Sequence, residues 1–159
     1  MSLLDKEPVK RAEKVLKNFD PKMNIIILEE SARTAFDAAN SLKCENGAII
    51  KSLLFKAKSS FILCLVSGDK RCSLNRLKKI VNIKDISMAS PEEVKMQTGY
   101  TIGGVSPVGH INKIEILIDK SLERFIYLYA AAGHPNCVFK INFINLLKIT
   151  NGKVKELIE

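Results

Sequence analysis

The stretch AIIKSLLFKA, residues 48–57, followed by Lys58-Ser59 and by SFILCLVS, residues 60–67, decides the fold class of this chain. Both runs are short and rich in β-branched and other apolar residues, as buried strands are. The two polar residues between them are the length of a tight turn. The pattern therefore predicts a β-hairpin, and the polar segment 68–71 ends its second strand.

Helices and further strands flank this hairpin in the sequence. Apolar residues at helical spacing, together with capping residues such as Ser73 and Ser90, predict helices at residues 7–19, about 35–42, 74–81, 91–98 and 142–149. Short apolar runs predict strands at 24–29, 113–119, 125–132 and 137–141, and Asn151-Gly152 turns the chain into a short terminal strand. This order predicts an α+β fold around a mixed, mostly antiparallel sheet.

The composition is that of a globular protein. A chain of 159 residues, 47% hydrophobic and 26% charged, predicts one domain spanning residues 1–159. Its apolar stretches, such as residues 61–66, fall far short of the ~18 residues that cross a bilayer. Residues 1–10 carry acids, bases and a proline in place of an apolar signal core. We therefore expect a soluble, cytoplasmic protein with no membrane partner.

The cysteines argue against a metal site. They stand at positions 44, 64, 72 and 137 and form no C-x-x-C pair. A structural zinc site is therefore not expected. Cys64 lies inside an apolar run, where a small buried hydrophobic residue is the expected role. Free thiols fit a reducing cytosol.

The charge balance favours a polyanionic partner. The chain has 25 Lys and Arg residues against 17 Asp and Glu residues, a formal charge of +8. For a small cytosolic protein, RNA is the leading candidate. A basic cluster stands on and before the helix predicted at 74–81 and consists of Lys70, Arg71, Arg76, Lys78 and Lys79. A solvated helix face is the default explanation of such a cluster.

The loop GYTIGGVSPVGH, residues 99–110, holds four of the eight glycines. It is not a G-x-S-x-G nucleophile elbow around Ser106, because Val108 stands where that motif has its last glycine and Pro107 has no N–H for an oxyanion hole. No Gly-Lys-Ser/Thr follows, so it is no Walker loop. Two interpretations are left: a run of backbone donors from Gly103 to Ser106, or an ordinary long turn.

Lys51 breaks the pattern of its strand. The period of two places it on the same face as Ile49, Leu53 and Phe55, while Ser52 belongs to the other face. A lysine on an apolar face must be paired, extend to a sheet edge, or serve a site, because burying an unpaired ammonium is costly. Ser52 alone reads as an ordinary polar strand residue.

Four of these segments together resemble one family. They are KSL at 51–53, VSG at 66–68, the glycine loop with Thr98 before it, and AAG at 131–133. In this order they resemble the YbaK/ProX group of aminoacyl-tRNA deacylases, which is related to the editing domain inserted in bacterial prolyl-tRNA synthetases. The resemblance runs from about Ser31 to the C-terminus.

The resemblance implies a fold and an activity. The implied fold is a single α+β domain whose sheet curls into a partial barrel with helices outside. The implied activity is hydrolysis, in trans, of the ester that joins alanine or cysteine to tRNA(Pro). The implied partner is aminoacyl-tRNA, and prolyl-tRNA synthetase is a further candidate. The resemblance implies no metal and no other cofactor. An ester activated by a ribose hydroxyl needs only a positioned water, backbone donors and one cation, without a protein nucleophile.

The resemblance also implies roles for individual residues. Lys51 would lie near the 3′-terminal adenosine and orient or neutralise the ester, the backbone of Gly103–Pro107 would hold the 3′ end, and Gly133 would belong to a second loop closing the pocket. Accordingly we predict catalytic roles for Lys51, Gly103 and Gly104, substrate contacts for Ser52, Val105, Ser106, Pro107, His110, Gly133 and His134, and tRNA contacts for Lys70, Arg71, Arg76, Lys78 and Lys79.

Several alternatives stay open at this point. Ala131 and His134 replace a serine and an arginine or threonine of many relatives, which leaves the amino acid removed undecided. His110 and His134 are either proton carriers or structural hydrogen-bonding residues. The rival function is a non-catalytic module that binds a tRNA end or an aminoacyl-adenylate. A hydrolase of another small ester is a weaker option, because no catalytic triad is evident.

Overall fold

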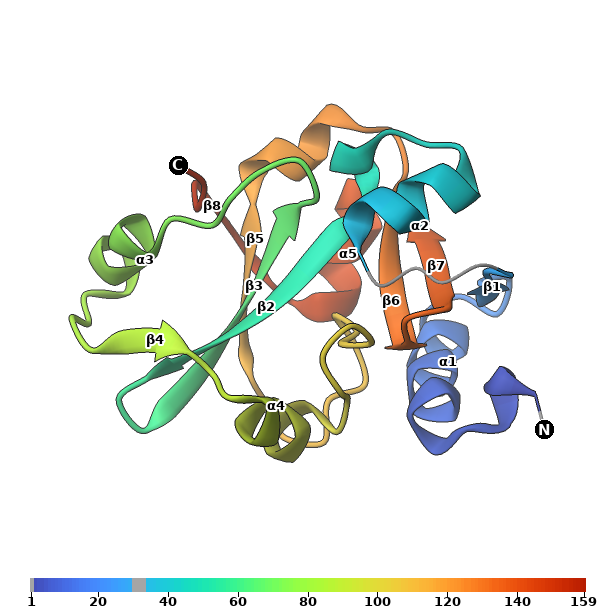
Figure 1. Ribbon diagram of the computed structural model, residues 1–159, viewed down its shortest axis with the longest axis horizontal. Helices are drawn as coiled ribbons and strands as arrows, with labels where there is room; N and C mark the ends of the chain where they lie inside the picture. The colour runs from blue at the N-terminus through green and yellow to red at the C-terminus, as the bar shows by residue number, and fades with distance from the viewer. Residues whose placement is uncertain (1, 30–33) are drawn as a thin grey trace.

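A computed structural model describes residues 2–29 and 34–159 and has the predicted α+β class (Figure 1). The helices are α1 (Glu7–Phe19), α2 (Ala35–Leu42), α3 (Leu74–Val81), α4 (Pro91–Thr98) and α5 (Phe143–Thr150), with short 3-10 turns at η1 (Leu3–Asp5), η2 (Asn46–Ala48) and η3 (Lys120–Arg124). The strands are β1 (Ile26–Ile27), β2 (Ile50–Ala57), β3 (Ser60–Ser67), β4 (Ile86–Met88), β5 (Glu115–Asp119), β6 (Leu128–His134), β7 (Cys137–Ile141) and β8 (Lys153–Lys155).

The strands of the described residues form two sheets. One has five strands in the order β4-β2-β3-β5-β8 and the other has three in the order β1-β7-β6. The β3–β5 and β5–β8 pairs are parallel and the others antiparallel, which confirms a mixed, mostly antiparallel arrangement. A single parallel bridge, between Ile49 and Tyr129, joins the two sheets. The sheets do not close into a barrel, and the partial barrel stays a prediction.

The predicted hairpin is the centre of the larger sheet. Its register runs from Ile50 opposite Ser67 to Ala57 opposite Ser60. One face, with Leu54 and Leu63, packs into the main core beneath α1, β6 and α5. The other face packs against α3 and the C-terminal segment, through residues that include Phe55, Ile62, Cys64 and Val66. Because both faces are covered, the two strands read as nearly continuous apolar runs.

Most predicted boundaries are confirmed and some differ. The strand predicted at 24–29 pairs only at Ile26–Ile27, and β4 was not predicted because three residues carry no readable alternation. The strand predicted at 125–132 begins at Leu128, because Asp119 caps η3 and the 3-10 turn takes up the chain as far as Arg124. At its other end β6 extends to His134 through a bulge.

Two local signals fix where the glycine loop begins. Ser90 and Glu93 form the predicted capping box at the start of α4, each side chain bonded to the other's backbone N–H at 3.1 and 2.9 Å. Gly99 ends the helix in the left-handed region, at φ +79°. The loop therefore leaves α4 at a defined place and direction.

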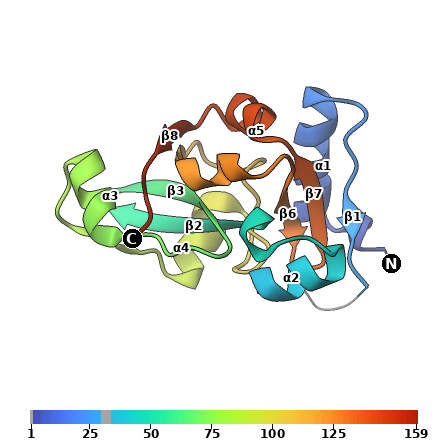
Figure 2. The same cartoon turned by 90° about the horizontal axis from the view of Figure 1, so that it is seen from above.

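The smaller sheet is covered on both faces. Figure 2 shows α1 and α2 on opposite sides of β6 and β7, as the alternation of their side chains requires. On the α1 side the contact is closest at Gly133, where an added Cβ would lie 2.7 Å from the carbonyl carbon and oxygen of Pro8. Gly133 therefore lets α1 lie directly against the end of β6.

We expect Gly133→Ala to destabilise the protein more than Gly103→Ala. Both glycines have nearly the same φ, +92° and +93°, so both substitutions carry the same backbone strain. Only Gly133 faces backbone, whereas an added Cβ at Gly103 meets the side chain of Pro135 at 3.4 Å. The difference in unfolding free energy, measured in urea, should be about 1–3 kcal/mol. Equal losses would contradict the close approach of α1.

Candidate functional site

A cavity of about 370 Å³ lies where the two sheets, α2 and the glycine loop meet. It brings together segments far apart in the sequence. Its lining residues are Thr34, Ala35, Ala38, Ile49, Ile50, Lys51, Ser52, Leu53, Ile102, Gly103, Val105, Tyr129, Ala130, Ala131, Pro135 and Val138. Of the predicted site residues, Lys51, Ser52, Gly103 and Val105 therefore share one cavity.

An unpaired edge of β2 forms one wall. Strand β4 covers only Phe55–Ala57, so the first half of β2 has no strand beside it on that side apart from the bridge at Ile49. The carbonyl of Leu54 accepts from Ala89 N on that edge at 3.0 Å. Because outward-facing residues recur every second position, the N–H and C=O of Ser52 also point to this edge. The wall thus offers both a backbone donor and a backbone acceptor.

The hydroxyl of Ser52 is a buried polar group without a partner. Its Oγ is enclosed and has no hydrogen bond to any described residue. Leaving such a group unpaired costs about 1–3 kcal/mol, so a ligand that bonds to it would recover that cost. From the residues alone Ser52 reads as an ordinary polar strand position, and the substrate contact predicted for it rested on the family resemblance.

Lys51 lies on the apolar face that the strand period predicted, with Leu53 and Phe55. Its Nζ donates a hydrogen bond to the carbonyl oxygen of Lys70, in the loop after β3. Burial lowers the pKa of Lys51, while the nearby Cys72 and Asp69 partly offset this effect. One of the three ammonium protons is thus used by the protein, and two are left for a ligand.

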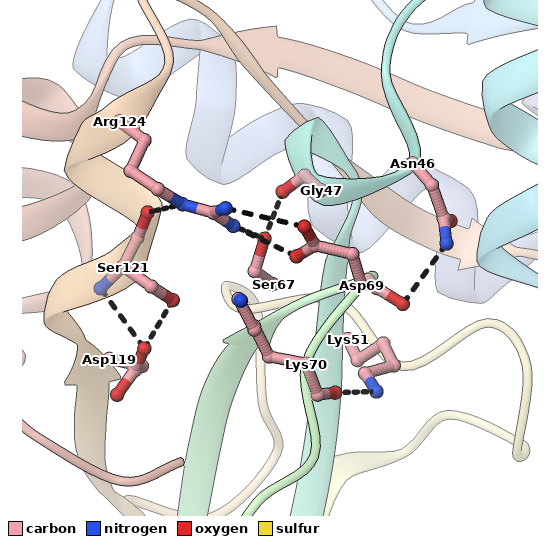
Figure 3. A network of polar contacts seen from close by, with 10 residues as sticks. Asn46, Gly47, Lys51, Ser67, Asp69, Lys70, Asp119, Ser121 and Arg124 are labelled. Atoms are coloured by element: carbon pink, nitrogen blue, oxygen red, sulfur yellow. Dashed lines mark hydrogen bonds and ion pairs between the residues drawn. The ribbon is translucent and has the colours of Figure 1, made fainter. Parts of the chain in front are cut away.

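A polar network holds the loop that carries Lys70 (Figure 3). Arg124 forms an ion pair with Asp69 at 2.8 Å and also donates to Ser67 Oγ at 2.9 Å. The Ser67 hydroxyl donates in turn to the carbonyl of Gly47. Asn46 Nδ2 donates to the Gly68 carbonyl at 3.3 Å. The position of the Lys51 ammonium therefore depends on contacts made by η2 and η3.

The glycine loop supplies some of the predicted donors and not others. Gly104 N donates to Thr101 O at 3.0 Å, and Gly133 N donates to Gly104 O at 3.0 Å. The first bond is internal to the glycine loop and the second ties the two loops together, which argues against a ligand contact through either amide. By contrast, the amides of Gly103, Val105 and Ser106 meet no acceptor within the described chain. Gly103 and Val105 are the two of these that line the cavity.

The loop is fixed by side chains beneath it. The buried Tyr100 hydroxyl donates to Val108 O at 2.7 Å, and burial raises its pKa to about 12. Arg11 donates to Gly109 O at 2.6 Å and lies 4.6 Å from the Tyr100 ring centroid. Arg11 was not predicted as a site residue, because its partners lie far along the chain. These contacts hold the loop in one shape without a ligand.

The histidines and the remaining loop residues lie outside the cavity lining. His110 Nε2 contacts the Ser106 carbonyl at 2.6 Å, which makes Nε2 the protonated nitrogen, and burial lowers the pKa of this imidazole. His134 Nδ1 accepts from Asn136 N at 3.0 Å. Both contacts are those of structural histidines. Ser106 and Pro107 are buried within the loop itself.

The predicted basic cluster is divided in space. Lys70 and Arg71 lie in the loop that contacts Lys51. Arg76, Lys78 and Lys79 lie on α3, which Figure 1 shows at the end of the molecule opposite β6 and β7. Of the cluster, Lys70 is therefore in direct contact with Lys51, which lines the cavity, and Arg71 follows Lys70 in the same loop.

Residues 2–29 and 34–159 contain no group of three or more His, Cys, Asp and Glu side chains placed to hold a metal ion. Over the same residues, no helix is both long and apolar enough to cross a membrane.

Comparison with known proteins identifies the family. The profile of the aminoacyl-tRNA editing domain matches residues 29–149. The chain belongs to this family. It is 32% identical over 129 residues to a proline–tRNA ligase of Kosmotoga olearia, covering 79% of this chain and 21% of that one. The editing domain thus spans about a fifth of that ligase's length.

Two relatives are close to this chain in length. The uncharacterised protein YwhH of Bacillus subtilis is 32% identical over 127 residues, covering 79% of this chain and 80% of that one. A crystal structure provisionally assigned as a trans-editing enzyme for prolyl-tRNA synthetase superposes with a TM-score of 0.91 at 34% identity, covering 97% of this chain and 98% of that one. The predicted resemblance to the YbaK-like editing domains is therefore confirmed.

We expect Asp69→Asn to lower the melting temperature at pH 7 by on the order of 2 °C, because the ion pair with Arg124 is lost. Hydrogen bonds from Arg124 lower the pKa of Asp69. A depressed pKa stabilises the fold above the unfolded value of about 3.9 and loses that effect as pH falls through the folded pKa. The difference from wild type should therefore shrink below about pH 4.

The exposed residue Asp85 provides the control, since it makes no side-chain hydrogen bond or ion pair to any described residue. Asp85→Asn should leave the melting temperature unchanged at both pH values. A difference between wild type and Asp69→Asn that stays constant from pH 7 down to pH 2.5, on the order of one pH unit below the unfolded pKa, would show that the ion pair does not hold the loop.

Proposed function

We propose that this editing domain is a free-standing, single-domain deacylase that hydrolyses mischarged tRNA(Pro) in trans in the cytoplasm, removing alanine or cysteine. The observation that carries the proposal is the shared cavity, where Lys51 and Ser52 meet the free amides of Gly103 and Val105. The family membership supports a deacylase role. The nearly full-length match to a provisional trans-editing enzyme supports action in trans.

The chemistry needs only groups that this cavity offers. Water attacks the carbonyl carbon of the ester, and the oxyanion that forms accepts hydrogen bonds from the Gly103 or Val105 amide. The Lys51 ammonium orients the ester or neutralises developing charge through a proton not given to Lys70. The ester bond to the ribose oxygen then breaks, and that oxygen takes up a proton. The products are the free amino acid and intact tRNA, with no metal required by any step.

The walls of the cavity favour a small acyl group. Ala35, Ala38, Ala130 and Ala131 line it together with branched apolar residues. Its volume of about 370 Å³ lies near the lower end of the usual range for small-molecule sites. Alanine and cysteine side chains fit a wall made of such small residues.

The charge of the domain supports tRNA as the substrate carrier. Of the predicted tRNA contacts, we expect Lys70 and Arg71, in the loop that contacts Lys51, to meet phosphates of the acceptor stem while the 3′ end enters the cavity. Arg76, Lys78 and Lys79 on α3 would contact phosphates only if the bound tRNA also extends over α3. A prolyl-tRNA synthetase could deliver the substrate, and the formal charge of +8 suits either route.

We expect the purified protein to release amino acid from alanyl- or cysteinyl-tRNA(Pro), and Lys51→Ala to lower kcat/KM by about 100-fold or more. The loss follows because no other cation of the described residues lines the cavity. Release of labelled amino acid is the measurement. Lys58→Ala, in the exposed hairpin turn, is the matched control and should keep wild-type activity.

The same assay separates the rival function. No release from either substrate, with tRNA binding retained, would establish a non-catalytic binding module. Full activity of Lys51→Ala would refute the role of Lys51 in the mechanism, but the deacylase activity itself would stand. Thermal unfolding of each variant shows whether the fold is intact.

We expect Ser52→Ala to raise KM for the aminoacyl-tRNA about fivefold to tenfold, as the loss of one hydrogen bond does. Folding stability should be unchanged or slightly higher, because the unpaired hydroxyl is removed. Ser67→Ala is the contrasting control: this hydroxyl is bonded to Gly47 and Arg124, so its loss should lower stability. Equal destabilisation by both substitutions would contradict a ligand-binding role for Ser52.

A further inference from the structure

Two strand edges from different sheets run apart at the cavity. Strands β2 and β6 start close together, where Ile49 forms a parallel bridge with Tyr129, and Figure 1 shows them diverging from that point. Continued in the same register, the ladder would pair Lys51 with Ala131, two residues further along each strand. No such pair forms between the described strands. The two edges therefore enclose a gap, and residues 50–53 and 129–131 line the cavity there.

The alternation along β2 determines which of its backbone groups point into the gap. The Ile49 carbonyl accepts from Gly68 N at 2.7 Å, on the β3 side. Because the direction alternates from residue to residue, Ile50 and Ser52 point the other way, as Leu54 does. The carbonyls of Ile50 and Ser52 and the Ser52 N–H thus face the gap. None of these three groups has a backbone partner within the described part of the chain.

The edge of β6 that faces β2 is free in the same way. A parallel bridge uses both backbone groups of one of its two residues. The Ile49 carbonyl is engaged on the β3 side, so that residue is Tyr129. Ala131 lies two positions further on and points in the same direction. Its N–H and C=O therefore face the gap, where no described backbone group bonds to them.

The lining of the cavity suits an uncharged amino group. No Asp or Glu lines it among residues 2–29 and 34–159, so an amino group there must donate to neutral oxygens. The lining has three hydroxyl groups, on Thr34, Ser52 and Tyr129, in addition to the edge carbonyls. Lys51 is the cation of this lining and favours the amine over the ammonium form of a neighbouring amino group. An amine has two N–H bonds, and carbonyls face the gap from both strands.

We propose that the gap between β2 and β6 binds the free α-amino group of the aminoacyl ester, which donates one N–H to a carbonyl of each strand edge. This inference rests on the proposed function, because it concerns the substrate of the same cavity. The amino group lies toward the Ile49–Tyr129 bridge, and the ester carbonyl lies toward the amides of Gly103 and Val105. Since the bridge closes the gap behind the amino group, N-acylated substrates such as peptidyl-tRNA are excluded.

Three analogues of the tRNA 3′ end test the inference without hydrolysis. Each is an adenosine in which an amide replaces the 3′ ester, and the acyl group is alanyl, lactyl or N-acetylalanyl. Calorimetric titration of the full chain measures their affinities. We expect the alanyl analogue to bind about tenfold more tightly than the lactyl analogue, because a hydroxyl has one proton to donate and leaves one carbonyl unpaired. The N-acetylalanyl analogue should bind about 100-fold more weakly than the alanyl analogue.

Three substitutions separate the strand edges from the hydroxyl groups. Ser52→Ala and Tyr129→Phe each remove a hydroxyl of the lining and keep every backbone carbonyl. Thr34→Gly removes the third, and glycine is tolerated at the N-cap position that Thr34 occupies. Each variant should keep the preference for the alanyl over the lactyl analogue, whatever its overall affinity. Loss of that preference in a variant that thermal unfolding shows to be folded would assign the amino group to that hydroxyl and overturn the proposal.

Hydrolysis assays separate this inference from the proposed function. Where alanyl-tRNA(Pro) is hydrolysed, N-acetylalanyl-tRNA(Pro) should be hydrolysed at least about 100-fold more slowly. Equal rates, or equal binding of the three analogues, would overturn the inference and leave the deacylase. If alanyl-tRNA(Pro) is not hydrolysed while the alanyl analogue still binds most tightly, the proposed function fails and the inference stands. Binding of none of the analogues at concentrations up to about 5 mM would also overturn the inference.

Discussion

The ammonium group of Lys51 needs a hydrogen-bond acceptor, because the strand period places it on an apolar face of the central hairpin. The Lys70 carbonyl supplies that acceptor, and the Arg124–Asp69 ion pair holds the loop that presents it. Contacts from η2 and η3 thus hold the β3–α3 loop in place. A charge that would destabilise a plain hairpin is thereby kept beside a cavity.

The cavity depends on a second constraint, the packing of two glycine loops. Gly104 and Gly133 bring their backbones together, and Gly133 N bonds to Gly104 O at 3.0 Å. An added Cβ at Gly104 would lie 2.9 Å from His134 N, so a side chain there would push the loops apart. The close approach of Gly104 and Gly133 holds the two loops together behind the cavity lining. The neighbouring amides of Gly103 and Val105 have no acceptor in the described chain and are left for a ligand.

Local signals made most of the fold predictable. The α4 capping box, the Gly99 helix end and the apolar runs of the hairpin each depend on residues close together in sequence, and each is confirmed. The division of the strands into two sheets could not be predicted from the sequence, because strand pairing joins segments that are distant in the chain. For the same reason Arg11 and the Lys70 carbonyl were missed. Their roles depend on partners that sequence does not place.

Lys51 and Ser52 show why one short segment carries so much of the site. Adjacent residues on a strand point to opposite faces, so their side chains separate while their backbone stays together. Lys51 turns toward the Lys70 loop, whereas Ser52 turns toward the core face and directs its N–H and C=O to the open edge of β2. One dipeptide therefore places a cation and edge backbone groups at the same cavity, with an unpaired hydroxyl buried beside them. This combination requires the edge of β2 to stay open. It stays open because the pairing of β4 with β2 ends where Met88 lies opposite Phe55.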